Sequence, residues 1–252
     1  MPLLQLNVIT QKLACQWGLN EKWLGYFQER EGLICTGCGS ARRSIFLAEG
    51  ILEFAKKSLG IDSETFKKLV VEEKFQKLKV AELNSLGSLH GFLKHSPNLH
   101  YSEYGSKNPN IRSEDLMDLS YGVNAFDWVL HSETLEHVPN FRRSWLEIYR
   151  VLKPGGVCIF TIPVVWDGRK SRTRARLNNG SIAYDLPASY HGLAGEEKSD
   201  YLVFHEFGED CLDEIQSYGF EIGMIKDSIN PALACFFAFK PKNAADSEAF
   251  DV

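Results

Sequence analysis

The chain has 252 residues, which is enough for one α/β domain with an N-terminal extension or for two small domains. Hydrophobic residues make up 44% of it and charged residues 24%, as in ordinary globular proteins. The formal net charge of −5 gives no electrostatic basis for binding a phosphate backbone and argues against DNA as a partner.

Targeting signals are also missing from the sequence. No apolar run reaches the ~18 residues that suggest a membrane span, and Met1 to Gly18 lacks the pattern of a secretory signal. The six cysteines are sparse, and Cys158 and Cys235 fall in strand-like apolar runs, as reduced thiols do. We expect a cytoplasmic protein without a membrane association.

The first predicted unit, residues 1–77, is an N-terminal helical segment. Apolar positions at helical spacing predict helices over 1–34, 44–59 and 63–77. Between the first two, Cys35-Thr36-Gly37-Cys38-Gly39 predicts a tight turn. A Cys-x-x-Cys-Gly knuckle can supply half of a zinc ribbon, but the second pair of ligands is missing from the sequence. We predict a turn with reduced thiols and no metal site.

The second unit, residues 78–240, alternates short apolar runs with helix-like segments, which favours a parallel sheet covered by helices. Helices are predicted over 141–152, ended by Lys153-Pro154-Gly155-Gly156, and over 207–218. The predicted strands cover 79–83, 99–103, a weaker run near 110–112, 126–131, 156–163, 219–225 and 233–239.

Two further segments are irregular. Residues 164–206 are too long for an ordinary connection and rich in aromatic and basic residues, so we expect an inserted loop that contacts substrate. Its Arg-rich part, 169–176, and the pair Arg42-Arg43 present charge either to an acidic acceptor or only to solvent. Residues 241–252 are polar and acidic, which predicts a disordered tail.

Two acidic residues at strand ends suggest a nucleotide-type site. Glu82 ends one predicted strand and leads into the small-residue turn Asn84-Ser85-Leu86-Gly87-Ser88. Glu103 ends the next strand, 21 positions later, close to the ~20-residue separation at which an acidic side chain reaches a ribose hydroxyl.

A third block, FDWVLHSETLEHVPNFRRSWLEIYRVLKPGGVCIFTIPV from Phe126 to Val164, resembles the central region of class I S-adenosylmethionine-dependent methyltransferases of the type 11 kind. In that family a strand of the form F-D-x-V leads to a Leu-Glu-His-Val segment, a helix and L-K-P-G-G. The resemblance covers residues 78–165 well and 203–239 more loosely. It implies a Rossmann-like, doubly wound, mostly parallel sheet of seven strands that binds S-adenosyl-L-methionine.

The resemblance also assigns residues to the cofactor. Glu82 would start the cofactor turn, which would pass under the methionine part with Asn84, Ser85 and Gly87. Glu103, with Tyr104 beside it, would hold the ribose. The adenine would be flanked by Asp115 and Leu116, and the sulfonium by His131 and Ser132.

The turn departs from the family pattern, acidic-x-Gly-x-Gly-x-Gly. Its three glycine positions hold Asn84, Leu86 and Ser88, and its single glycine is Gly87. Glycine permits positive φ and a close backbone approach, and asparagine also tolerates the left-handed region. Cofactor binding through this turn therefore depends on Asn84 and Gly87.

The chemistry of methyl transfer leaves the acceptor open. A hydroxyl acceptor needs a base, for which His191, His137 and Glu133 are the candidates, whereas an amine acceptor needs little more than desolvation. We expect a methyltransferase for a small molecule or a glycan, because the 164–206 loop could fold over a modest acceptor.

Two other functions compete with this one. The glycine-poor turn allows a non-catalytic binding or scaffold protein that keeps the methyltransferase fold. A dinucleotide-dependent oxidoreductase shares the βαβ logic but lacks the Gly-x-Gly-x-x-Gly turn.

Overall fold

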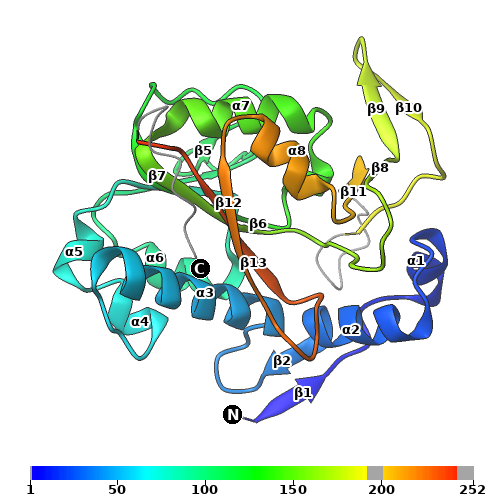
Figure 1. Cartoon of the computed structure of the whole chain (residues 1–252), viewed down its shortest axis with the longest axis horizontal. Coiled ribbons are helices and arrows are strands. Elements are labelled where there is room, and N and C mark those ends of the chain that lie inside the picture. The colour runs from blue at the N-terminus through cyan, green and yellow to red at the C-terminus, as the bar shows by residue number, and fades with distance from the viewer. Residues whose placement is uncertain (1, 192–200, 243–252) are drawn as a thin grey trace.

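The computed structural model of the chain describes residues 2–191 and 201–242. A seven-stranded sheet lies at its centre, in the order β12-β13-β7-β6-β3-β4-β5 (Figure 1). The strands are β3 (Val80–Leu83), β4 (Leu99–Glu103), β5 (Arg112–Ser113), β6 (Phe126–Ser132), β7 (Leu152–Thr161), β12 (Glu221–Lys226) and β13 (Ala234–Phe239). β13 runs antiparallel to both of its neighbours, and the five strands from β7 to β5 are parallel. The predicted fold class is confirmed.

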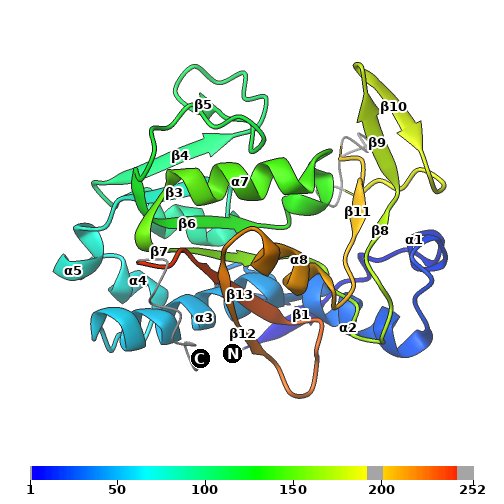
Figure 2. The same ribbon diagram turned by 45° about the horizontal axis from the view of Figure 1, so that its top comes forward.

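Helices cover both faces of the sheet, as Figures 1 and 2 show. On one face lie α3 (Arg42–Leu59), α4 (Phe66–Leu69), α5 (Glu73–Gln76) and α6 (His90–Leu93), the last preceded by the 3-10 turn η1 (Gly87–Leu89). On the other lie α7 (Phe141–Val151) and α8 (Cys211–Ser217). The turn η2 (Leu135–His137) connects β6 to α7.

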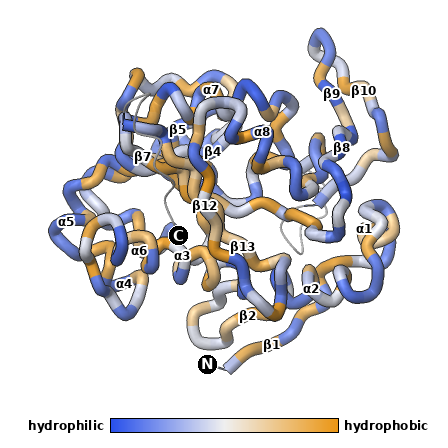
Figure 3. Tube along the Cα trace, viewed as in Figure 1, coloured by the Kyte–Doolittle hydropathy of each residue, from blue (hydrophilic) through white to orange (hydrophobic). Residues whose placement is uncertain are grey.

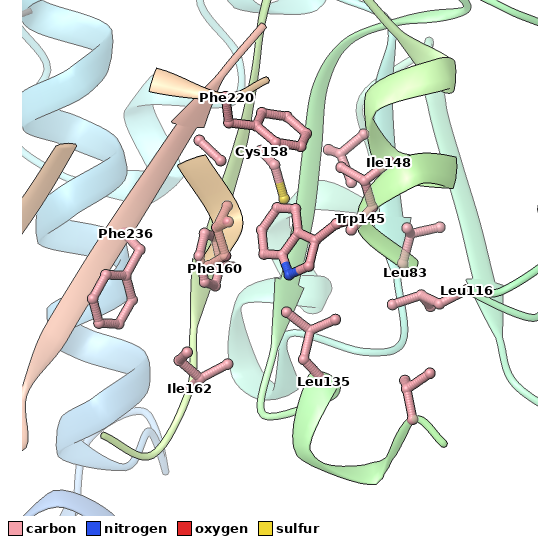
Figure 4. Close-up of a cluster of buried hydrophobic side chains, with 14 of the residues drawn as sticks. Leu83, Leu116, Leu135, Trp145, Ile148, Cys158, Phe160, Ile162, Phe220 and Phe236 are labelled. Atoms are coloured by element: carbon pink, nitrogen blue, oxygen red, sulfur yellow. The ribbon is translucent and has the colours of Figure 1, made fainter. Parts of the chain in front are cut away.

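The two faces of the sheet build two separate hydrophobic cores, because side chains alternate along each strand. In β7, Val157 and Ile159 face the α3 side, whereas Cys158 and Phe160 face the α7 side. β13 is buried on both faces and is correspondingly hydrophobic along its length in Figure 3. On the α7 side the fully buried Trp145 points at the sheet between Phe160 and Leu135 (Figure 4).

The N-terminal segment differs from the all-helical prediction for residues 1–34. It contains α1 (Gln11–Gln16) and α2 (Glu21–Gly32), but β1 (Leu3–Gln5) pairs antiparallel with β2 (Leu33–Cys35). The side chains of Thr10 and Asn20 cap the two helices. The two strands were missed because each has three residues and its partner lies about thirty residues away.

Other predicted element boundaries also differ from those in the structure. The helix predicted over 63–77 is two single turns, α4 and α5, and the one over 207–218 shortens to α8. β7 begins at Leu152, before the Pro-Gly-Gly that we expected to precede the strand. A Cβ on Gly156 would lie 2.9 Å from the carbonyl oxygen of Asp127, so this position admits only glycine without a shift.

The predicted loop 164–206 contains regular structure. β9 (Ala175–Asn178) and β10 (Ser181–Tyr184) form a hairpin that projects from the body in both Figures 1 and 2. β8 (Arg172–Thr173) pairs with β11 (His205–Glu206) at its base. Residues 192–200 of this segment, and 243–252 of the predicted disordered tail, lie outside the described residues. Across the ranges that the structure does describe, no helix is long and apolar enough to cross a membrane.

Candidate functional site

The predicted site residues gather where parallel strands end. β3, β4 and β6 run in the same direction, with Glu82 opposite Tyr101 on one side and Leu130 on the other. β4 lies on one side of β3 and β6 on the other, so the strand order reverses between β3 and β6. Open α/β sheets bind ligands in the crevice at the carboxyl ends of strands at such a point.

Glu82 holds the turn that follows β3. Its side chain is fully buried, and its carboxylate accepts hydrogen bonds from the backbone N–H of Leu86 at 2.9 Å and from Nδ1 of His90 at 2.7 Å. Burial raises the pKa of the Glu82 carboxyl, against the two hydrogen bonds. The acidic residue therefore organises the turn from inside.

Asn84 and Gly87 supply the unusual backbone conformations of the turn. Their φ angles are +62° and +64°, so both lie in the left-handed region. The Oδ1 atom of Asn84 also accepts a 2.9 Å hydrogen bond from the backbone N–H of Tyr104, which ties this turn to the end of β4. Ser85 adds a local bond, because its Oγ accepts from the N–H of Gly87 at 3.2 Å.

Glu103 lies at the end of β4 and is half-buried. The Tyr101 hydroxyl donates to Oε1 of Glu103, and the Tyr101 ring packs on His90 with centroids 4.0 Å apart. Glu82, His90, Tyr101 and Glu103 therefore form one connected polar group beside the turn. His90 and Tyr101 were not among the predicted site residues.

Asp115 and Leu116 follow β5. Leu116 is buried in the core on the α7 side, and Asp115 accepts a 2.8 Å hydrogen bond from the N–H of Met117. They lie in the connection after β5, the strand that neighbours β4.

The end of β6 divides its polar residues between two environments. His131 is fully buried against Phe160, and neither ring nitrogen has a hydrogen-bond partner among the described residues. Burial lowers its pKa to about 3. This ring is part of the α7-side core and does not face the carboxyl edge as expected. Ser132 does reach the edge, where its Oγ lies 2.7 Å from Oγ1 of Thr161 and accepts from Nη1 of Arg43 at 2.5 Å.

Glu133 is engaged in a bidentate ion pair. Arg30, whose side chain is 1% exposed, donates to its two carboxylate oxygens at 2.8 and 2.6 Å. Burial by itself raises the pKa of this carboxyl, but the charges of Arg30 and Arg43 outweigh burial and lower it to about 2. A carboxylate with so low a pKa is a weak base, so the geometry does not favour Glu133 as the base for an acceptor.

The N-terminal segment thus lies against the carboxyl edge of the sheet. Besides Arg30 and Arg43, it contributes Ser40, whose Oγ lies 2.7 Å from that of Ser88 in the cofactor turn. These contacts were missed, because they depend on tertiary packing, which no local sequence pattern shows.

His137 and His191 lie side by side, with ring centroids 4.5 Å apart, although they are far apart in the sequence. Together with Glu136 they place one ligand atom each within 4.8 Å of one another. Burial lowers the pKa of both rings, that of His191 to about 3, so both are neutral at pH 7. The structure therefore unites two of the three predicted catalytic residues in a cluster with a buried carboxylate that the prediction passed over.

The basic stretch of the insertion is paired within the protein. Arg169 binds Asp167, Arg172 and Arg174 both bind Glu206, and Arg176 binds Asp185. The four arginines are therefore engaged by acidic groups of the protein itself, which differs from both predicted alternatives, an acidic acceptor or solvent alone. A cleft of about 520 Å³ opens beside the hairpin and the start of α7, but none of the predicted cofactor residues lines it.

The Cys-x-x-Cys turn holds two free thiols. Cys35 is buried, Cys38 is exposed, and Cys38 Sγ lies 3.1 Å from Oγ of Ser40. Within residues 2–191 and 201–242, no further His, Cys, Asp or Glu side chains join these thiols in a group that could hold a metal.

A comparison of the sequence with known families decides the family. The family described as a methyltransferase domain matches residues 34–160, which is half of the chain. The chain belongs to the methyltransferase domain family. The predicted class I methyltransferase family, and S-adenosyl-L-methionine as the cofactor of that family, are thereby confirmed.

Individual relatives of this methyltransferase-domain chain are more distant. It is 29% identical over 165 residues to a demethylmenaquinone methyltransferase of Listeria welshimeri, covering 62% of this chain and 55% of that protein. It is 32% identical over 136 residues to the protein of the same description from Oceanobacillus iheyensis, covering 53% of this chain and 46% of that protein. The chain therefore spans about half the length of the curated relatives that it matches.

Solved structures resemble the chain loosely. The 1,6-didemethyltoxoflavin-N1-methyltransferase of Burkholderia thailandensis is 14% identical, covers 79% of this chain and 87% of its own, and superposes with a TM-score of 0.46. A likeness this remote carries no argument about substrate.

Proposed function

We propose that this chain transfers a methyl group from S-adenosyl-L-methionine to a small-molecule acceptor. The observation that carries the proposal is the polar arrangement at the carboxyl ends of β3 and β4. Glu82 and Glu103 end neighbouring parallel strands, and the turn between them takes positive φ at Asn84 and Gly87, the two residues able to replace the missing glycines. In a domain of the methyltransferase family, this geometry supports binding of the methyl donor.

Each part of the turn has a role in the proposal. The backbone of residues 84–88 runs under the methionine part of the donor, and the Glu103 carboxylate accepts hydrogen bonds from the ribose hydroxyls. Asp115 and Leu116 flank the adenine. The bound donor supplies an already activated methyl group, so the protein's main task is to hold the acceptor in line with it.

The acceptor proposed is a small aromatic molecule. The relatives that match the chain are described as demethylmenaquinone methyltransferases, which makes a quinol the first acceptor to test. The chain's own residues support an aromatic ligand near η2, where Trp17, His137, His191 and Tyr201 bring their rings together. The comparisons give no support for a glycan.

Calorimetric titration with S-adenosylmethionine and S-adenosylhomocysteine tests donor binding. We expect binding by the unaltered protein and at least about tenfold weaker binding by Glu103→Ala, because one or more charge-assisted hydrogen bonds to the ribose are lost. Glu64→Ala is the matched control, since Glu64 is an exposed acidic residue of a surface pair and should leave binding unchanged.

Three outcomes would refute the proposal or part of it. The absence of heat with both compounds on folded protein would favour the scaffold alternative. Equal binding by Glu103→Ala would remove the assigned ribose contact. Donor binding without transfer of a labelled methyl group to any of a panel of small aromatic hydroxyl compounds would refute the acceptor class.

A further inference from the structure

We propose that Glu136, His137 and His191 form a binding site for a divalent transition-metal ion. The three side chains come from η2 and from the end of the described part of the insertion, and one ligand atom of each lies within 4.8 Å of the others. The site goes beyond the proposed methyl transfer, and metal binding is measured without the methyl donor.

The Glu136 carboxylate is the strongest sign of a cation-binding site. Its side chain is fully buried, and neither carboxylate oxygen has a hydrogen-bond partner among the residues that the structure describes. A buried carboxylate without hydrogen bonds is costly, so such groups are normally paired or bound to a metal. Arg30 acts on Glu136 only at a distance, because its guanidinium binds Glu133 and Glu31.

His137 presents the correct nitrogen to the cluster. Its Nδ1 lies 3.0 Å from the carbonyl oxygen of Leu202, so Nδ1 carries the proton and donates it. The other nitrogen, Nε2, then carries a lone pair that can bind a metal, and it lies 3.8 Å from Oε1 of Glu136. A second ring nitrogen bonded to a backbone carbonyl is the usual way in which a metal-binding histidine is oriented.

His191 completes the cluster with a buried ring nitrogen, Nε2, that also has no partner within the described residues. The ring packs between His137 and Trp17, with centroids 4.5 and 5.4 Å away. Trp17 is itself held by a 3.1 Å hydrogen bond from its Nε1 to Oγ of Ser189.

One extended segment, residues 201–204, positions the ligands from both elements. The backbone N–H of Phe204 donates to the carbonyl oxygen of Glu136 at 2.7 Å, and Leu202 accepts from His137. On the other side, Val203 donates to Ser189 at 2.9 Å and His191 donates to Tyr201 at 3.3 Å. The cluster is therefore assembled by backbone hydrogen bonds and does not depend on a metal to bring it together.

The ligand types select the kind of metal. Two neutral imidazoles and one carboxylate suit Zn²⁺, Co²⁺, Fe²⁺ or Ni²⁺ better than Mg²⁺ or Ca²⁺, which prefer all-oxygen sites. Three protein ligands leave a coordination position open. On the basis of the proposed function, this position would take an acceptor oxygen and favour its deprotonation.

Metal titration of the full chain, stripped with a chelator, tests the site. We expect about one Zn²⁺ or Co²⁺ per chain by elemental analysis of the dialysed protein, and no comparable retention of Mg²⁺. Glu136→Gln, which preserves shape, and His191→Ala should each weaken Co²⁺ binding about a hundredfold or more, because removing a ligand costs at least as much as removing its hydrogen-bonded support. Circular dichroism checks that the variants are folded.

Cys35→Ser with Cys38→Ser is the matched control, because this pair is the other metal-ligating motif of the sequence. The control should bind Co²⁺ as the unaltered protein does. The visible spectrum of the unaltered Co²⁺ protein provides a test that needs no variant, since nitrogen and oxygen ligands give d–d bands without thiolate charge transfer.

Failure of the unaltered protein to retain Zn²⁺ or Co²⁺ would overturn the proposal. So would thiolate bands in the Co²⁺ spectrum, loss of binding in the cysteine control, or unchanged binding by His191→Ala. Each of these outcomes leaves donor binding at Glu103 untouched, so the two proposals fail independently.

Discussion

At the scale of single residues, the Arg30–Glu133 ion pair joins α2 to the end of β6. Arg30 is almost fully buried, and Glu133 is 16% exposed. Removing one partner of a buried pair leaves an uncompensated charge and typically costs about 3–5 kcal/mol. We predict that Arg30→Ala lowers the free energy of unfolding by about 3 kcal/mol or more, measured by urea denaturation.

Lys57→Ala provides the comparison for this variant. Lys57 pairs with Glu53 on the exposed side of α3, where such pairs contribute less than about 1 kcal/mol. The double variant Arg30→Ala/Glu133→Ala should recover part of the lost stability, because the orphaned carboxylate is gone. Similar losses in Arg30→Ala and Lys57→Ala would contradict the account.

Burial of His131 should make the stability of the protein depend on pH. Burial lowers its pKa from the usual 6.5 to about 3. Between these values the unfolded chain binds the proton and the folded protein does not, so stability decreases as pH falls through this range. We predict that the free energy of unfolding, measured by urea denaturation, decreases less between pH 7 and pH 5 in His131→Leu than in the unaltered protein. Part of the decrease should remain, because the pKa of His191 is also lowered. A variant curve parallel to that of the unaltered protein would show that His131 does not titrate in this way.

Residue types predicted some of the site and missed the rest for a physical reason. Positive φ at Asn84 and Gly87 could be predicted, because backbone tolerance belongs to the residue itself. The partner of Glu133 could not, because Arg30 is 103 positions away and only the fold brings it there. The burial of His131 follows from strand alternation, since neighbouring Leu130 and Val129 already face opposite cores.

At the scale of elements, the contact between α3 and β13 depends on Gly50. A Cβ there would lie 2.6 Å from Sγ of Cys235, whereas a Cβ on Gly25 in α2 would meet nothing within 4 Å. Alanine has the higher helix propensity by about 1 kcal/mol, but overpacking costs about 1–3 kcal/mol. We predict that Gly50→Ala lowers the melting temperature and that Gly25→Ala raises it slightly. An equal rise in both variants would mean that the helix can shift away from the sheet without cost.

The central strands β3, β6, β7 and β13 were predictable as elements because each contains a buried apolar run. The N-terminal pair β1–β2 was not, since β1 is exposed throughout and β2 buries only Cys35, so neither strand carries such a pattern. The sequence does contain a turn signal for the hairpin β9–β10, which the loop prediction did not use. Asn179-Gly180 links the two strands with φ of +49° and +80°, as expected of the tight turn that this dipeptide favours.

At the scale of the whole molecule, the N-terminal segment and the sheet share a single structure. Phe46 and Ile51 of α3 lie in the same core as Val157 and Ile159 of β7, while Arg30 and Arg43 reach the carboxyl edge. The sequence division at residue 77 therefore separates two stretches that are packed together (Figure 2). The sequence did not predict that the N-terminal segment covers the carboxyl edge of the sheet, because this contact depends on tertiary packing.

The central claim is that the methyl donor binds at the carboxyl ends of β3 and β4. Hydrogen–deuterium exchange with and without S-adenosylhomocysteine locates the bound molecule on the full chain. We predict slower exchange in peptides spanning 82–90 and 101–105, and no change in the hairpin peptide spanning 175–184. Unchanged exchange in both site peptides at saturating ligand, or protection confined to other regions, would contradict the account.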